Sequence, residues 1–208
     1  MIGLEVIERL ALLALTSGFV MGERPISLII AASRGSGKSD LLGQYRNFPG
    51  TAYRSYSTFA SIMHELGPQI AAGTLHHLIL PTIDVITEAP REKALAELAA
   101  FSVLIEEGLK EWTTMRIQFR SNVPRTVGLI TSASEDTIHR LTELKAVGFL
   151  GRCVVVSYSY SEETLDAVAE SITLGQTISP FSFNGIAPRA IESDPDVIRR
   201  YWGNPTLA

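Results

Sequence analysis

The stretch ISLIIAASRGSGKS, residues 26–39, constrains this chain most, because an apolar run leads directly into a loop of glycines and serines. The run from Ile26 to Ala32 is typical of a strand that is buried on both faces, as in a parallel sheet. Residues 38–48, KSDLLGQYRNF, then favour a helix, and Pro49 and Gly50 are its stop signal. A strand, a glycine-rich loop and a helix in immediate succession predict an α/β fold.

Strands and helices alternate along the rest of the chain. Further strands are predicted at residues 51–56, 75–81, 127–131 and 153–157, and the last three are expected to be buried. The other predicted helices cover residues 3–16, 57–71, 91–108 and 135–147, and a last one follows residue 159. Ser57 and Ser134 are the expected caps of two of these helices, and Ser159 with Glu162 has the spacing of a capping box. This order predicts an α/β three-layer sandwich with a mostly parallel sheet of five strands.

One folding unit and a tail are expected. The unit covers residues 1–178, with an N-terminal helix within residues 1–20 and a hairpin insertion at residues 113–126, whose turn is expected at the letters SNVP. Residues 179–208 form the tail. A hydrophobic content of 46% in 208 residues is enough for a substantial core.

The composition narrows the function classes. A formal net charge of -4 restricts any contact with nucleic acid to a local basic patch. The single cysteine, Cys153, excludes an intramolecular disulfide and multi-cysteine zinc sites, so we expect a cytoplasmic protein. Glu5, Glu8 and Arg9 interrupt the first apolar segment, and no other run is long enough to span a bilayer, so no membrane association is expected.

The glycine-rich loop matches a phosphate-binding motif. Residues 32–39, ASRGSGKS, fit the phosphate-loop pattern with alanine in place of its first glycine. Glycines let successive main-chain N–H groups turn toward phosphate oxygens. We expect Lys38 to reach the β and γ phosphates of ATP and the Ser39 hydroxyl to hold Mg²⁺. The residues expected to bind the nucleotide are Ser33, Arg34, Gly35, Ser36, Gly37, Lys38, Ser39 and Asp40.

ATP hydrolysis also needs a carboxylate near the metal, at the end of a neighbouring strand. The residue after the predicted strand 75–81 is Thr82, which is not an acid, and Asp84 comes two residues later. We expect Asp84 to be the acid on the metal side, although a solvated loop aspartate fits the same position. His76 and His77 are adjacent on a strand and point to opposite faces, so packing is the expected role of both.

Two further positions are candidates for catalysis. Thr131 and Ser132 end a predicted buried strand beside the ligand crevice, where a hydroxyl could orient the attacking water. A helix-capping role fits them equally well. Arg152 stands between glycines immediately before the last predicted strand, and an ordinary surface arginine is the alternative there.

Four segments in order, AASRGSGKSD, LHHLILP, LITSAS and GFLGRCVVVSYS, resemble the nucleotide-binding core of AAA+ ATPases over about residues 20–175. The resemblance implies that Thr131 or Ser132 is the sensor at the tip of the fourth strand. It also implies that Arg152 approaches the γ-phosphate bound by a neighbouring subunit, in a homo-oligomeric ring or helix. An arginine in this role contributes on the order of 10³ or more in rate.

Two departures from this family are visible. The family carries a helical lid after its core, with a second sensing arginine. The tail here is rich in proline, glycine and asparagine, so the lid is expected to be absent or vestigial, and Arg189 is no safe substitute for that arginine. Thr82 in the place of an acid leaves hydrolysis less secure than nucleotide binding.

The partner of such an ATPase is the least constrained feature. Arg116, Arg120 and Arg125 lie around the tip of the predicted hairpin. Several DNA motors of the AAA+ family carry a pore hairpin at this point, so the resemblance suggests contact with phosphate backbones. Arginine on a hairpin is also ordinary surface decoration.

Two functions are therefore predicted as alternatives. The first is an oligomeric ATPase that acts on or with nucleic acid as a motor, loader or remodelling subunit. The second is a nucleotide-dependent docking protein with weak or no hydrolysis, which engages a protein partner through residues 194–204. Arg200, Tyr201 and Trp202 in that segment are residue types that anchor interfaces.

Overall fold

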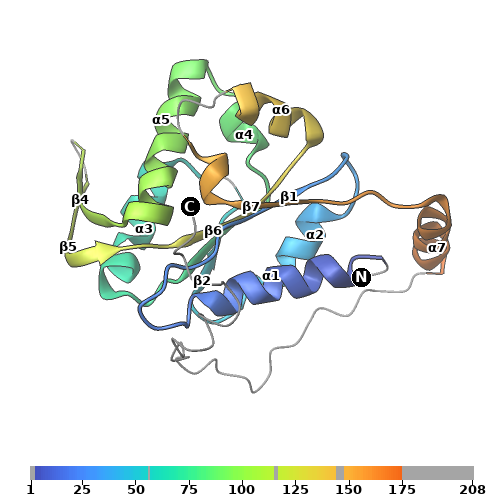
Figure 1. The fold of residues 1–208 in the computed structure, drawn as a ribbon, viewed down its shortest axis with the longest axis horizontal. Helices are drawn as coiled ribbons and strands as arrows, with labels where there is room; N and C mark the ends of the chain where they lie inside the picture. The colour runs from blue at the N-terminus through green and yellow to red at the C-terminus, as the bar shows by residue number, and fades with distance from the viewer. Residues whose placement is uncertain (1–2, 56, 115–116, 144–147, 175–208) are drawn as a thin grey trace, which may run out of the picture.

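The protein is built around a parallel β-sheet. The computed structural model describes residues 3–55, 57–114, 117–143 and 148–174. Five strands form the sheet in the order β2-β3-β6-β1-β7, and every neighbouring pair is parallel (Figure 1). The strands are β1 (Leu28–Ala31), β2 (Thr51–Tyr53), β3 (His77–Leu80), β6 (Gly128–Ala133) and β7 (Val154–Ser157). The predicted α/β fold with a parallel sheet of five strands is confirmed.

Helices cover both faces of the sheet. In Figure 1, α1 and α2 lie on one side of the sheet and α4, α5 and α6 on the other, whereas α7 lies beyond its end. The α-helices in the described residues are α1 (Glu5–Ser17), α2 (Lys38–Gly43), α3 (Phe59–Ala72), α4 (Asp84–Thr87), α5 (Arg91–Ser102), α6 (Glu135–Glu143) and α7 (Glu162–Thr173). None of them has the length and apolar character that a membrane crossing requires.

Two apolar clusters hold the layers together. Successive strand residues point to opposite faces, so Ile29 belongs to the cluster under α3 and α5, and Ile30 to the cluster under α1 and α2. In the same way, Leu129 belongs to the cluster under α3 and α5, and Ile130 to the cluster under α1 and α2. The continuous apolar run in β1 is therefore explained by burial on both faces.

Several helix boundaries and caps differ from the sequence predictions: α5 ends at Ser102, not at residue 108, and α4 was not predicted. The helix of the glycine-rich loop ends at Gly43, not near Phe48, because the next residues make i→i−3 bonds such as Tyr45 N to Leu42 O at 3.2 Å. The cap of α3 is Thr58, whose hydroxyl accepts from the Ser61 amide at 3.2 Å, and not Ser57. For α7 the capping hydroxyl belongs to Ser161, not Ser159; it accepts from the Thr164 amide.

The hairpin exists, but its turn lies earlier than SNVP. Strands β4 (Leu109–Thr113) and β5 (Gln118–Arg125) are antiparallel, and the Thr114 amide donates to the Ile117 carbonyl oxygen at 2.8 Å. The SNVP segment lies inside β5. It faces the part of β4 between Leu109 and Glu111, where the register of the strand pairing changes. Proline is tolerated there because a two-stranded ribbon consists of edge strands only.

The last strand is an edge strand, although its apolar sequence predicted burial. Among the described residues β7 pairs with β1 alone, and Val154 and Val155 are 50% and 42% exposed. Ile26 is likewise 45% exposed, because β1 begins two residues after it. Apolar composition therefore predicted where these strands lie in the sequence, but it did not predict which of their residues are buried in the core.

Candidate functional site

The glycine-rich loop leaves β1 at the carboxyl edge of the sheet. It stays attached to β6, because the Ala32 amide donates to the Ala133 carbonyl oxygen at 3.3 Å. Gly35 and Gly37 both have a φ of 77°, a backbone conformation that favours glycine over residues with a Cβ. The glycines of the motif are therefore required by the shape of the loop, and α2 begins directly after them.

Lys38 folds back over this loop. Its ammonium group donates to the carbonyl oxygens of Ala32 at 2.7 Å and Ser33 at 2.5 Å, and it lies 3.2 Å from the Ser36 hydroxyl oxygen. Carbonyl oxygens carry partial negative charge, so phosphate oxygens could replace them as partners of the same ammonium. The lysine predicted to contact phosphates is thus positioned on the loop itself.

Two carboxylates lie near this lysine. Burial lowers the pKa of the Lys38 ammonium, and the neighbouring carboxylates of Asp84 and Glu135 act in the opposite direction. Asp84 was expected from the sequence. Glu135 lies in the first turn of α6, and no sequence motif marks it as a site residue. It comes near Lys38 because β6, which precedes it, lies beside β1 in the sheet.

Asp84 is held in place by main-chain contacts. Its carboxylate accepts a hydrogen bond from the Ser134 amide at 3.1 Å, and its own amide donates to the Thr82 hydroxyl at 3.2 Å. Thr82, the departure noted in the sequence, therefore supports the turn that carries the acid. Ser134 also caps α6 as predicted, because its hydroxyl accepts from the Thr137 amide at 3.3 Å.

The residues present fit Mg²⁺ held chiefly by a nucleotide. In the described part of the chain, no three His, Cys, Asp or Glu side chains gather as a metal site. Mg²⁺ commonly takes one or two protein oxygens and completes its shell with phosphates and water. The exposed Ser39 in the first turn of α2 and the Asp84 carboxylate supply oxygens of that kind.

Thr131 and Ser132 are buried inside the edge of the sheet, with exposures of 0% and 1%. The Ser132 hydroxyl donates to the Pro81 carbonyl oxygen at 2.5 Å, and the Thr131 hydroxyl makes a long contact of 3.4 Å with the Ser132 carbonyl oxygen. Both hydroxyls thus have partners within the protein. Neither caps α6, since Ser134 takes that role.

Arg152 lies at the amino ends of the strands, whereas the glycine-rich loop lies at their carboxyl ends. It ends the short 3₁₀ helix Leu150–Arg152 just before β7, whereas the loop follows the carboxyl end of the parallel strand β1. Its guanidinium forms an ion pair with Glu106 and donates to the Gly148 carbonyl oxygen at 3.0 Å. Any contact between Arg152 and a nucleotide on this loop would require a second copy of the chain.

The hairpin arginines are not gathered at one point. Arg120 is exposed and pairs with Glu111 across the ribbon, while Arg125 lies at the base of the hairpin. A Cβ on Gly73, at the end of α3, would stand 2.7 Å from the Arg125 guanidinium. Arg116, Arg189 and the predicted docking segment 194–204 lie outside the described residues.

His76 and His77 serve packing, as the sequence predicted. His77 is fully buried, and its ring contacts the Ile26 carbonyl oxygen at 3.2 Å. The His76 ring lies 4.6 Å from that of Phe19, between ring centres.

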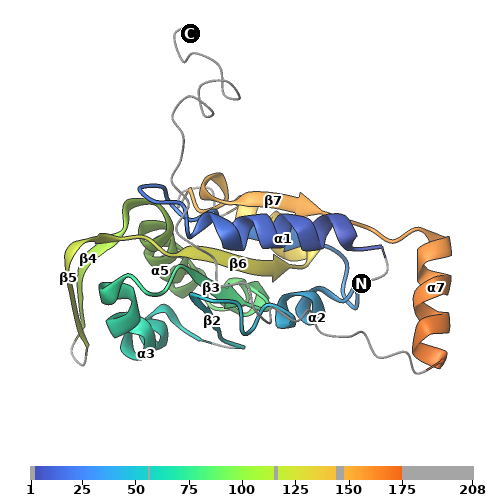
Figure 2. The same ribbon diagram turned by 90° about the horizontal axis from the view of Figure 1, so that it is seen from below.

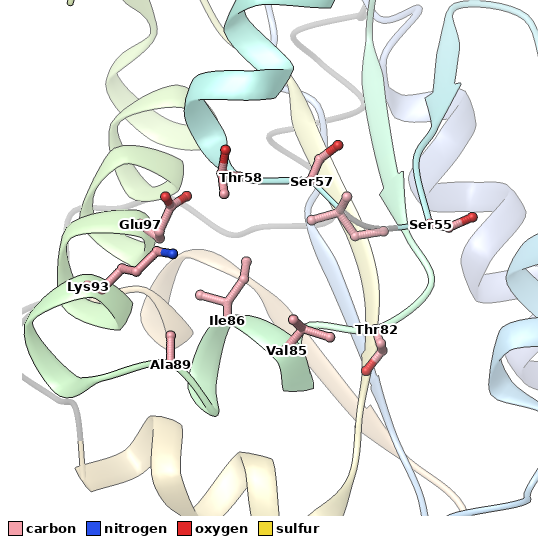
Figure 3. Close-up of a pocket in the computed structure, with 10 residues that line it drawn as sticks. Ser55, Ser57, Thr58, Thr82, Val85, Ile86, Ala89, Lys93 and Glu97 are labelled. Carbon is pink, nitrogen blue, oxygen red and sulfur yellow. The ribbon is translucent and has the colours of Figure 1, made fainter.

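A separate hollow lies at the end of β3, between α4, α5 and the start of α3 (Figure 3). Its residues are Ser55, Ser57, Thr58, Leu80, Thr82, Val85, Ile86, Ala89, Lys93 and Glu97. The Glu97 carboxylate accepts from the Phe59 amide at 2.6 Å, so it is engaged at the start of α3. No sequence motif points to this hollow.

No protein-family model matches this chain, and no curated protein sequence matches it. The assignment of a function therefore depends on the arrangement of its own residues.

Proposed function

We propose that this chain is an oligomeric protein with a core of the AAA+ type that binds and hydrolyses ATP with Mg²⁺ and acts on or with nucleic acid. The observation that carries the proposal is the phosphate-loop motif at the carboxyl end of β1, with Lys38 on the loop and the carboxylates of Asp84 and Glu135 near it. A lysine, an acid and a glycine loop at one edge form the minimum set for binding a triphosphate with its metal.

The strand order supports the same proposal. β1 connects through α2 to β2, which lies three places away in the sheet, while β7 lies beside β1 on its other side. The loop after β1 therefore lies where the chain's connections diverge. Open α/β sheets bind ligands at such a point, outside the carboxyl ends of the strands.

In this proposal each residue has one task. Main-chain N–H groups of residues 33–38 and the Lys38 ammonium bind the phosphates. Ser39 and Asp84 hold the metal with its water, and Mg²⁺ neutralises charge on the phosphate oxygens. Arg152 completes the site of a neighbouring copy in a ring or helical assembly.

The test combines ATPase rate with molecular mass at several concentrations of the full chain. We expect both to rise together, because one site then needs two copies. Lys38→Ala should abolish ATP binding and hydrolysis, whereas Lys93→Ala, which removes an exposed lysine of α5 away from the loop, should leave both intact. A wild-type chain that binds no ATP in the presence of Mg²⁺ would overturn the proposal.

The docking function has one observation in its favour. Thr131 and Ser132 are buried and their hydroxyls have protein partners, so neither is exposed to orient a water molecule. Slow hydrolysis with tight ATP binding would follow. An ATPase rate that stays near background while ATP binding depends on Lys38 would favour this second function over the first.

The nucleic-acid part of the proposal rests on the projecting hairpin. Figures 1 and 2 both place β4 and β5 at one end of the molecule and α7 at the other. Arg120 is exposed there, whereas Arg125 lies against the end of α3. DNA at low salt should stimulate the ATPase, and Arg120→Gln should reduce that effect because it removes a phosphate contact. No stimulation at low salt would remove nucleic acid from the proposal.

A further inference from the structure

The phosphate loop has a second set of contacts, from the segment that links β7 to α7. The Tyr158 hydroxyl donates to the Ser36 carbonyl oxygen at 2.7 Å and lies 3.3 Å from the Ser36 hydroxyl oxygen. The Tyr160 hydroxyl donates to the same carbonyl oxygen at 3.1 Å. One peptide group of the loop therefore accepts hydrogen bonds from two phenols that come from more than 120 residues further along the chain.

The two tyrosines are themselves held in place. The Tyr158 amide donates to the Ala31 carbonyl oxygen at 3.2 Å, which extends the pairing of β7 with β1. Their rings meet edge to face with centres 5.6 Å apart, and both pack against the apolar cluster under α1. Two phenols fixed by a strand and by the core can hold the glycine-rich loop, because they belong to a different part of the chain.

The bond to the Ser36 carbonyl has a geometrical consequence. The peptide between Ser36 and Gly37 is trans, so its C=O and N–H point in opposite directions. Gly37 has a positive φ, and a glycine at this place lets the peptide rotate readily. Holding the carbonyl on the tyrosine side therefore directs the Gly37 N–H to the opposite side of the loop.

Both hydroxyls remain donors over the physiological range. Burial, with the neighbouring Tyr158, raises the pKa of Tyr160 to about 12. Burial also raises the pKa of Tyr158, although its side-chain contacts with Ser36 and Tyr160 act in the opposite direction. A deprotonated phenol would repel the carbonyl oxygen, so the contact requires that both tyrosine hydroxyls keep their protons.

We infer that Tyr158 and Tyr160 are positioning residues for nucleotide binding: they hold the Ser36–Gly37 peptide so that the Gly37 N–H faces the polyphosphate of a nucleoside triphosphate. The inference rests on the proposed function, since it assigns the ligand of the loop to that class. Neither tyrosine needs to touch the nucleotide.

The experiment measures the affinity of the full chain for MgATP in Tyr158→Phe, Tyr160→Phe and the double variant. Phenylalanine keeps the ring packing and removes only the hydroxyl. The loss of one hydrogen bond that orders the loop should raise Kd about fivefold, and the double variant should lose more. Tyr45→Phe is the matched control, because the Tyr45 hydroxyl also donates to a main-chain carbonyl oxygen, that of Glu8, at 2.9 Å.

Hydrogen exchange without nucleotide separates positioning from general stability. In the tyrosine variants the amides of residues 34–38 should exchange faster, while those of β1 and β6 stay protected. Unchanged affinity in both single variants and the double variant, or a loss equal to that of Tyr45→Phe, overturns the inference and leaves the proposed function standing. A wild-type chain that binds no ATP overturns both.

Discussion

The Ser132 hydroxyl donates a hydrogen bond of 2.5 Å to the Pro81 carbonyl oxygen, and this bond ties the carboxyl ends of β6 and β3 together. The Ile83 amide donates in return to the Ser132 carbonyl oxygen at 2.9 Å. These two bonds fix the start of α4, and with it Asp84, relative to the strand that precedes Glu135. The placement of an acid near Lys38 therefore depends on a serine that need not touch any ligand.

Ser132→Ala should destabilise the protein more than it slows any ATPase. The buried Pro81 carbonyl would lose its donor, which costs about 1–3 kcal/mol in the free energy of unfolding. Urea denaturation measures that loss. Thr131→Val is the control, and its effect should be smaller because the Thr131 contact is long, at 3.4 Å. A large loss of ATPase rate with unchanged stability would instead indicate that Ser132 acts on the reacting water.

Asp84→Asn should separate binding from hydrolysis. The amide oxygen of asparagine can still accept from the Ser134 amide, so the loop should keep its shape, while the negative charge for the metal is lost. Hydrolysis should fall by about 100-fold, and its dependence on Mg²⁺ should shift to higher concentration. Glu88→Gln removes an exposed acid directly after α4. It should leave the hydrolysis rate and its dependence on Mg²⁺ unchanged. Equal rates for Asp84→Asn and wild type would exclude Asp84 from the metal side.

The fold was largely predictable because its strands are apolar and its helices alternate with them. The parallel sheet of five strands follows from that order, and the glycine-rich loop between β1 and α2 follows from local spacing. β7 was predicted to be buried because CVVVS has the composition of an interior strand. Composition does not report position in the sheet, and in the described part of the chain β7 has a neighbouring strand on one side only.

Only part of the site was predictable from the sequence. Lys38 and the glycines lie within one motif, and Asp84 was expected from its place shortly after a predicted strand. Glu135 approaches Lys38 through the pairing of β6 with β1, and Tyr158 approaches Ser36 through the pairing of β7 with β1. Strand order decides both contacts, and no spacing within the sequence encodes it.

Mixing two inactive variants tests whether Arg152 serves a neighbouring copy. Lys38→Ala lacks its own phosphate contact and should be inactive alone, and Arg152→Ala lacks the arginine and should lose about 10³ in rate. In a mixed oligomer, some interfaces join an intact loop to an intact arginine, and part of the ATPase activity should return. No recovery, with mixed oligomers present by mass, would contradict a shared site.

The ion pair of Arg152 with Glu106 supplies the control for that experiment. If Arg152 only stabilises its own chain, Glu106→Gln should lower the ATPase rate as much as Arg152→Ala does. If Arg152 acts on a neighbour, Glu106→Gln should lower stability slightly and leave most of the rate.

His77 should make the folded protein sensitive to mild acid. Burial lowers its pKa to about 4, against the raising effect of its bond to the Ile26 carbonyl oxygen. The unfolded chain takes up this proton below about pH 6.5, whereas the folded chain takes it up only near pH 4. The contribution of His77 to the free energy of unfolding is therefore complete above about pH 6.5 and falls by about 3 kcal/mol as the pH drops toward 4. The free energy of unfolding, measured by urea denaturation between pH 7 and pH 4.5, should change less with pH in His77→Gln than in wild type. His64→Gln, which removes an exposed histidine, should follow wild type. An NMR titration of His77 with a midpoint near its ordinary pKa would contradict this prediction, because a proton taken up equally by both states changes no stability.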